Sequence, residues 1–158
     1  MSTQVTEWLS RSGRRFKVVA HAPTYDAIEE AIVLGQPPRD VIKSVVLDTG
    51  LGHALAILPA SERVDLGLVR EATGDPHAHL ATEAELAHDF PEFELGAVPP
   101  VGCLAHAPVY VDPAVMFEPE VAFAASQTES VKIAPEQLFG DQYVTVTPIS
   151  KRIEDPGA

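Results

Sequence analysis

Short apolar runs separated by glycine, proline and polar residues follow one another along the whole chain. Runs rich in Val, Ile and aromatic residues predict strands, and apolar residues spaced three or four positions apart predict helices. The predicted strands are residues 16–20, 41–47, 53–58, 77–80, 108–111, 121–125, 130–133 and 143–147. The predicted helices are residues 3–12, 26–35, 66–72 and 82–90, and a short one from residue 135. The helix at 26–35 runs through Ile28, Ile32 and Val33.

Strands and helices are intermixed, and some neighbouring strands are close enough along the chain to pair as hairpins. The turn at 48–52 joins the two strands beside it into a hairpin, and the two strands before residue 134 form another pair. Hairpins together with longer crossovers indicate a mixed α/β (α+β) fold rather than a doubly wound parallel sheet. We expect a single domain over residues 1–158, with an N-terminal helix and strand in 1–20 and a polar tail at 151–158.

The composition is that of a globular protein with a strongly acidic charge. Hydrophobic residues make up 46% of the chain, the mean hydropathy is +0.06, and the formal net charge is −12. No apolar run approaches the roughly 18 residues of a membrane span, and residues 1–8 lack the basic and apolar regions of a secretory signal. The single cysteine, Cys103, excludes an internal disulfide and fits a reducing compartment. We therefore expect a cytoplasmic protein with no membrane partner.

The basic residues are concentrated in the first part of the chain. Residues 1–70 hold eight Lys/Arg and eight Asp/Glu, whereas residues 71–131 hold eleven Asp/Glu and neither Lys nor Arg. Proteins that bind nucleic acid usually present a basic surface. The basic cluster near the N-terminus consists of Arg11, Arg14, Arg15 and Lys17. We therefore expect no DNA binding, and any RNA contact should be weak, confined to one face or helped by a partner.

The strand at 41–47, with the sequence Val-Ile-Lys-Ser-Val-Val-Leu, holds one charged residue, Lys43. A buried ammonium group is costly unless it reaches water, an anion or a ligand. One interpretation is a gatekeeper lysine on an edge strand, or a side chain whose end reaches solvent over its apolar stem. The other interpretation is that Lys43 projects into a cleft and meets a ligand there.

A second unusual stretch, residues 96–102, has the sequence Gly-Ala-Val-Pro-Pro-Val-Gly. Two glycines frame two prolines, so the loop is stiff and its backbone is open to close approach. An ordinary rigid turn would have the same composition. If the loop binds a ligand, Gly96 should keep the space beside it open, and valine at this position should harm activity far more than stability.

The lysine-bearing strand and the later Gly-x-x-x-Pro loop, from Gly96 to Pro100, together resemble the YbaK/EbsC family. This family comprises free-standing relatives of the editing insertion domain of bacterial prolyl-tRNA synthetases. Two further stretches are similar to family patterns: Pro-Val-Tyr-Val-Asp at 108–112, and Pro-Ala-Ser-Glu-Arg-Val-Asp at 59–65. The resemblance covers roughly residues 24–149. It implies a curved, partly barrel-like mixed β-sheet surrounded by helices, with a cleft on one side.

The resemblance implies trans-editing, in which an aminoacyl-tRNA deacylase hydrolyses the ester bond of a mischarged aminoacyl-tRNA. Such an ester is already activated, so the protein must hold it, place a water and stabilise the developing oxyanion. The implied catalytic residues are Lys43, Gly96, Pro100 and Gly102. The implied substrate-binding residues are Ser44, Val98, Pro99, Val101, Ala125, Ser126 and Gln127. The implied partners are the 3′ end of an aminoacyl-tRNA and a synthetase, with no cofactor.

The sequence departs from the family at 125–127, which reads Ala-Ser-Gln where many relatives carry Gly-Ser-His or a Gly-Gly element. The methyl group of Ala125 narrows the approach to a ligand, and Gln127 keeps hydrogen bonding but cannot titrate. Together with the acidic composition, this departure leaves an alternative open. The chain could be a non-catalytic module that retains the family cleft and binds a small molecule or a synthetase.

Other chemistry has weaker support in the sequence. His77 and His79 share one face of a strand, but no Cys, Asp or Glu stands at an obvious ligand spacing, so we expect no metal site. Cys103 has His106 three residues later, a candidate thiol and base, although a buried structural thiol is the commoner role. The sequence contains no motif of serine hydrolases, P-loop proteins or dinucleotide-binding folds.

Overall fold

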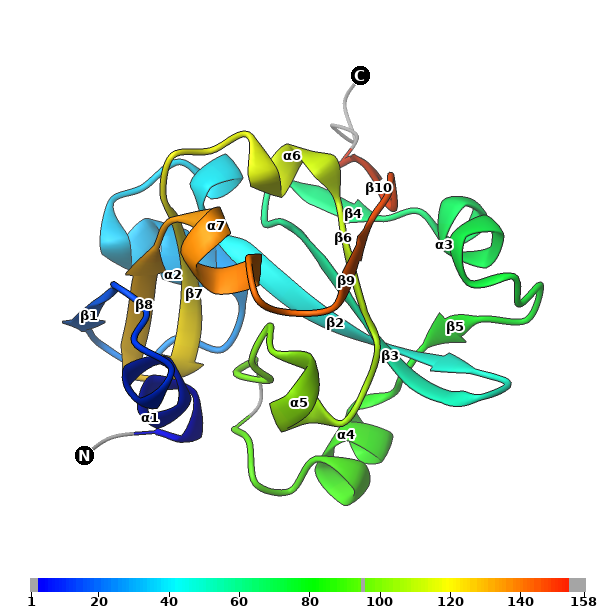
Figure 1. Cartoon of the computed structure of the whole chain (residues 1–158), viewed down its shortest axis with the longest axis horizontal. Coiled ribbons are helices and arrows are strands. Elements are labelled where there is room, and N and C mark those ends of the chain that lie inside the picture. Colours follow the sequence, from blue (N-terminus) through cyan, green and yellow to red (C-terminus); the bar gives the residue numbers. More distant parts are fainter. Residues whose placement is uncertain (1–2, 95, 154–158) are drawn as a thin grey trace.

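The computed structural model of the chain describes residues 3–94 and 96–153, and Figure 1 shows their arrangement. The helices are α1 (Gln4–Arg11), α2 (Ala27–Leu34), the 3₁₀ turn η1 (Pro38–Asp40), α3 (Leu66–Thr73), α4 (Glu83–Asp89), α5 (Gly102–Ala105), α6 (Pro113–Met116) and α7 (Pro135–Phe139). The strands are β1 (Lys17–Ala20), β2 (Ile42–Thr49), β3 (Gly52–Pro59), β4 (Glu62–Val64), β5 (His79–Leu80), β6 (Val109–Val111), β7 (Val121–Ser126), β8 (Glu129–Ile133), β9 (Val144–Val146) and β10 (Ser150–Arg152).

The central sheet is mixed, as the intermixed pattern predicted. Its strand order is β5-β2-β3-β6-β9. The predicted hairpin is confirmed, because β2 and β3 pair antiparallel along their whole lengths with Lys43 opposite Leu58. Strand β6 pairs parallel with β3 on one side and with β9 on the other. These pairs are parallel because the chain crosses over through helices before it returns to the sheet. Strand β5 pairs with β2 only at Leu47 and Asp48, so the β2 edge is uncovered at Lys43.

A second, antiparallel sheet has the strand order β1-β8-β7. It contains the predicted pair of β7 and β8. A single parallel bridge between Val41 and Ala122 connects its β7 edge to the start of β2. In Figure 1, α2 lies behind β7 and β8. Among the described residues the sheets do not close into a barrel, so a mixed α/β domain is confirmed and its barrel-like curvature stays a prediction.

The C-terminal residues 151–158 were predicted to be a polar tail, and this prediction is wrong at its start. Lys151 and Arg152 belong to β10, which pairs antiparallel with β4 in a two-stranded ribbon. Neither strand was predicted, because both are short and polar and owe their pairing to contacts far apart in sequence. Ile153 follows β10 and is exposed, and residues 154–158 of the predicted tail lie outside the described residues.

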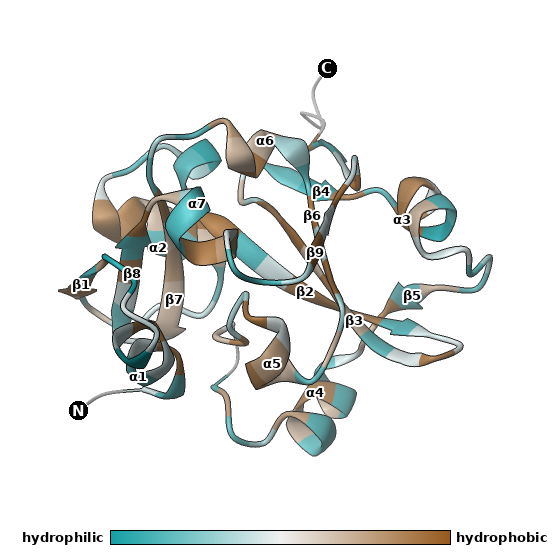
Figure 2. Cartoon of the chain, in the orientation of Figure 1, coloured by the Kyte–Doolittle hydropathy of each residue, from teal (hydrophilic) through white to brown (hydrophobic). Residues whose placement is uncertain are grey.

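The core lies between the strands, and Figure 2 shows apolar residues concentrated along β3 and β6. Leu55, Ile57 and Val111 are fully buried there. Helix α2 turns the opposite face to the core from the one that its apolar residues indicated. Ile32 is 76% exposed, whereas Glu30 is 1% exposed. A glutamate therefore occupies the inner face of a helix whose isoleucines face outward.

Candidate functional site

A cavity of about 560 Å³ lies between β2, the start of α2, α4 and the loop at 96–98. This volume is in the range of small-molecule sites, roughly 300–1,000 Å³. Its lining residues are Tyr25, Asp26, Ala27, Glu30, Ile42, Lys43, Ser44, Val45, Val46, Leu80, Ala81, Glu83, Leu86, Gly96, Val98, Phe123 and Ala124. We call this space the editing cavity, after the activity that the sequence resemblance predicts. Its walls come from five segments of the chain, the fifth being Phe123 and Ala124 of β7.

Lys43 is half-buried and lines the editing cavity together with Gly96. Burial lowers the pKa of its ammonium group, and the charges of Asp26 and Glu62 oppose this change. No ion pair of Lys43 within 4.0 Å is present among the described residues. The lysine therefore presents a partly dehydrated donor to an incoming anion or carbonyl oxygen.

Two residues of the loop have backbone N–H groups without a partner among the described residues. The N–H groups of Gly96 and Val98 make no hydrogen bond within the described part of the chain, and both residues line the cavity. By contrast, Ala97 donates its N–H to the carbonyl oxygen of Glu94. Uncommitted N–H groups in a loop that lines the same cavity as a lysine are candidate donors to an oxyanion.

The space beside Gly96 is not open, contrary to the expectation from sequence. Gly96 has φ +82°, and a Cβ atom on it would lie 2.6 Å from the backbone oxygen of Tyr25. Glycine is therefore required here by its own backbone conformation and by close packing against the segment that leads into α2.

Several predicted site residues lie away from the editing cavity. Pro99, Ala125 and Ser126 line a separate cavity of about 150 Å³ next to α1. Pro100 and Val101 belong to the loop but are buried. Gly102 is the first residue of α5, and its N–H donates to Gln142 Oε1 at 3.1 Å. Gln127 follows β7 at the turn, where its N–H donates to Glu94 Oε1. The structure thus brings Lys43, Ser44, Gly96 and Val98 together and separates the others from them.

Helix α2 supplies cavity residues that the sequence analysis did not identify. Glu30 is the most buried of them, and its Oε2 accepts a hydrogen bond from the Ser130 hydroxyl group. Burial raises the pKa of Glu30 to about 7, and the bond from Ser130 opposes this increase only in part. The sequence shows only two adjacent glutamates, Glu29 and Glu30, in a short and otherwise apolar helix, and hydropathy alone places both on the outer face.

Residues 21–139 match the family model described as the aminoacyl-tRNA editing domain. The chain belongs to this family. It is 31% identical over 127 residues to the multifunctional Ser/Thr-tRNA deacylase ProXp-y of Escherichia coli (strain K12), covering 77% of this chain and 75% of the relative. The predicted family and its aminoacyl-tRNA deacylase activity are thereby confirmed.

Solved structures agree with this assignment. A protein described as a candidate trans-editing enzyme for prolyl-tRNA synthetase superposes with a TM-score of 0.80 at 28% identity, covering 93% of this chain and 94% of that one. A hypothetical protein with 22% identity superposes with a TM-score of 0.83, over 93% of this chain and 99% of that chain, and supports the fold alone. No helix in the described part of this editing domain is long and apolar enough to cross a membrane.

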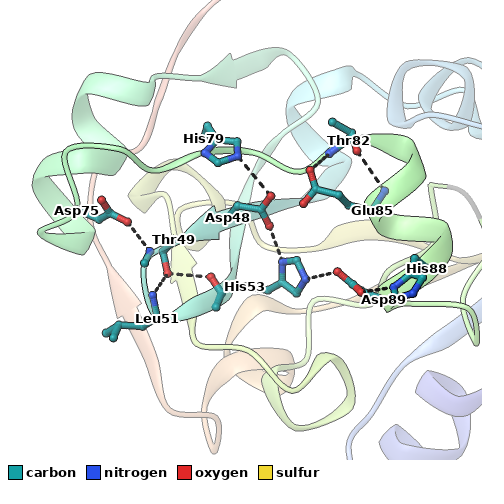
Figure 3. Close-up of polar contacts among 12 residues, drawn as sticks. Asp48, Thr49, Leu51, His53, Asp75, His79, Thr82, Glu85, His88 and Asp89 are labelled. Atoms are coloured by element: carbon teal, nitrogen blue, oxygen red, sulfur yellow. Dashed lines mark hydrogen bonds and ion pairs between the residues drawn. The ribbon is translucent and has the colours of Figure 1, made fainter.

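A chain of polar side chains attaches α4 to the β2–β3 hairpin of the editing domain, as Figure 3 shows. His53 on β3 lies with Nδ1 2.8 Å from Asp48 Oδ1 and with Nε2 2.8 Å from Asp89 Oδ2. Asp89 is the last residue of α4, and its Oδ1 lies 2.8 Å from His88 Nδ1. Since Glu83 and Leu86 of α4 line the cavity, these contacts hold one of its walls in place.

The pair of His77 and His79, for which no metal site is expected from the sequence, is not the group that the structure brings together. His79, Asp48 and Glu85 hold donor atoms within 4.8 Å of one another, whereas His77 is not part of this group. The sequence analysis missed the two carboxylates because strand pairing and a helix bring them from residues 31 positions upstream and six positions downstream of His79. The site is empty, and the same arrangement is expected of a histidine that simply interacts with two carboxylates.

Cys103 is exposed, so the expectation of a buried structural thiol is wrong. It lies on α5 and does not line the editing cavity. The thiol is therefore no candidate for attack on a ligand held there.

The predicted basic cluster near the N-terminus is partly engaged in structural contacts. Arg14 lies over the Trp8 ring at 4.2 Å, and its Nη2 is 3.7 Å from Asp141 Oδ2.

Proposed function

We propose that this editing domain hydrolyses, in trans, the ester that joins a wrongly attached small amino acid to the 3′ end of tRNA, and that the reaction takes place in the editing cavity. The observation that carries the proposal is that Lys43 lines the same cavity as Gly96 and Val98, whose N–H groups make no hydrogen bond within the described part of the chain. These are three donors around a space large enough for the end of the tRNA and a small side chain.

The proposed mechanism needs no protein nucleophile. Lys43 interacts with a phosphate or with the ester carbonyl oxygen, and the two N–H groups stabilise the negative charge that develops on that oxygen. The free hydroxyl group of the terminal ribose assists the attacking water. The protein supplies orientation and electrostatic stabilisation, which suffice for an ester that is already activated.

Pocket size gives the proposed selectivity. One methylene group changes binding by about 1–3 kcal/mol, so a closed pocket excludes large side chains more readily than it separates small ones. Because the relative from Escherichia coli is named a deacylase of Ser- and Thr-tRNA, seryl and threonyl esters are the first substrates to assay. The net charge of −12 opposes tRNA binding, so we further propose that a synthetase, in the cytoplasm, presents the tRNA.

The test is a panel of tRNAs mischarged with small and large amino acids, incubated with the wild-type chain and followed by loss of the ester. We expect turnover of esters with small side chains. Binding of charged tRNA without turnover of any ester would overturn the proposal and favour the non-catalytic module.

A further inference from the structure

Two acidic side chains are buried in the described part of the chain, Glu30 and Asp112. Asp112 Oδ2 accepts hydrogen bonds from the N–H groups of Ile149 and Ser150 and from the Ser150 hydroxyl group, and Oδ1 accepts one from Ala114. Glu30 has one partner, the Ser130 hydroxyl group. A buried carboxyl group normally has its bonding capacity filled. Glu30 has fewer hydrogen-bond partners than Asp112, and it lines the editing cavity.

Glu30 is connected to the protein surface through two further side chains. Ser130 is fully buried, and its Oγ lies 2.8 Å from Nε2 of the half-buried His21. His21 Nδ1 lies 2.7 Å from the carbonyl oxygen of Ala22. A carbonyl oxygen only accepts, so Nδ1 carries a proton and Nε2 is the atom that gains or loses one.

The hydrogen-bonded series of Glu30, Ser130 and His21 has two arrangements that hold the same number of protons. In one, the Glu30 carboxyl group donates to Ser130 Oγ, and the Ser130 hydroxyl group donates to a neutral His21. In the other, both bonds are reversed, so that His21 is an imidazolium and Glu30 a carboxylate. One proton leaves Glu30 and a different one reaches His21 Nε2, so the interconversion needs no added donor or acceptor.

The substrate of the proposed reaction carries a group that suits this acid. An aminoacyl ester has an α-ammonium group, and a charge-assisted bond to a carboxylate is strongest where water is excluded. The other carboxylates on the cavity are exposed: Asp26 caps α2 by accepting from the Glu29 N–H, and Glu83 starts α4.

We propose that Glu30 is a specificity-determining residue that binds the α-ammonium group of the esterified amino acid, with Ser130 and His21 taking up the proton that Glu30 releases. This inference rests on the proposed function. Lys43 and Glu30 then hold opposite charges of the same substrate in one cavity. No substrate bond breaks in the step, since the ammonium group only becomes the counter-ion of the carboxylate.

The test compares two esters on each enzyme preparation, one with an α-amino group and one with an α-hydroxyl group in its place. The variant Glu30→Gln keeps the size of the side chain and removes its charge. We expect the ratio of kcat/KM for the amino ester to that for the hydroxy ester to fall by about 10- to 100-fold, the range of a bond to a charged group. Because both esters are measured on one sample, loss of folded enzyme does not change the ratio.

The matched control is Glu29→Gln, which removes the same charge from the same helix at an exposed position outside the cavity. Its ratio should equal that of the wild type. An unchanged ratio in Glu30→Gln would overturn the inference. If the wild type hydrolyses neither ester, the proposed function fails instead. Calorimetry with non-hydrolysable 3′-amide analogues of the two esters then tests the ammonium site separately, and equal affinities of wild type for both would overturn it.

Discussion

Gly96 packs against the backbone of Tyr25 so closely that a Cβ atom on Gly96 would lie 2.6 Å from the Tyr25 oxygen. Both residues line the editing cavity, one from the loop and one from the segment before α2. The contact therefore sets the distance between two walls that come from opposite halves of the chain.

We predict that Gly96→Ala destabilises the fold as well as the site. The left-handed backbone costs a non-glycine residue about 1–3 kcal/mol, and the clash with Tyr25 adds to it. The control is Gly74→Ala, since Gly74 has a similar φ of +72° but no atom within 4 Å of its added Cβ. Urea denaturation should show a larger loss for Gly96→Ala than for Gly74→Ala. Equal losses would mean that the Tyr25 contact adds nothing.

The parts of the fold that local pattern determines could be predicted from the sequence. The β2–β3 hairpin follows from two apolar runs around a glycine-containing turn, and the helix starts at Asp26, Asp65 and Thr82 follow from capping residues. Lys43 stood out because it is a charged residue in an apolar strand, and it lies in the cavity. Each of these inferences uses neighbours along the chain.

The parts that depend on long-range packing could not be predicted. Hydropathy places Ile32 inside and Glu30 outside, yet α2 turns Glu30 toward Ser130, which lies 100 residues away. The resemblance placed Gly96 and residues 98–102 at the site, but Pro100 and Val101 are buried, whereas Val98 lines the cavity. Motif membership therefore identified the right loop without distinguishing its cavity-facing residues from its structural ones.

We predict that Lys43→Ala lowers the rate of deacylation by roughly two orders of magnitude, the scale of losing one electrostatic stabiliser. The fold should be retained, because Lys43 has no ion pair within 4.0 Å among the described residues. Lys43→Arg should recover part of the rate, since arginine keeps the positive charge but carries it on a planar guanidinium group. Single-turnover hydrolysis measures the rates, and circular dichroism checks folding. Cys103→Ser is the control; an inactive Cys103→Ser beside an active Lys43→Ala would refute the assignment.

We predict that the His53 network stabilises the protein more at pH 6 than at pH 9. Burial lowers the pKa of His53, but the hydrogen bond to Asp89 and the charge of Asp48 outweigh this and leave the pKa above its ordinary value. A raised histidine pKa contributes stability below the unfolded value of 6.5, and this contribution is lost as the pH rises through the folded value. His53→Gln should therefore lower Tm at pH 6 and change it less at pH 9. His77→Gln, at an exposed position outside this network, should show no such difference.

We predict that Glu30 lowers the stability of the folded protein at neutral pH, whatever its role in substrate binding. Its folded pKa of about 7 exceeds the ordinary value of 4.5, so between these values the folded state binds more protons than the unfolded state. Stability should therefore fall as the pH rises from 4.5 to 7 and remain lower above it. A difference of this size corresponds to at most about 3 kcal/mol.

Glu30→Gln cannot ionise, so its stability should lack this decline and should exceed that of the wild type at pH 8. Urea denaturation at pH 5 and pH 8 measures both proteins, with Glu29→Gln as the control that keeps the decline. If Glu30→Gln is no more stable than the wild type at pH 8, interactions in the folded protein offset the cost of burying the carboxylate, and the prediction is wrong. A variant that gains stability while losing discrimination for the α-amino group would show that the protein retains a destabilising acid for its substrate.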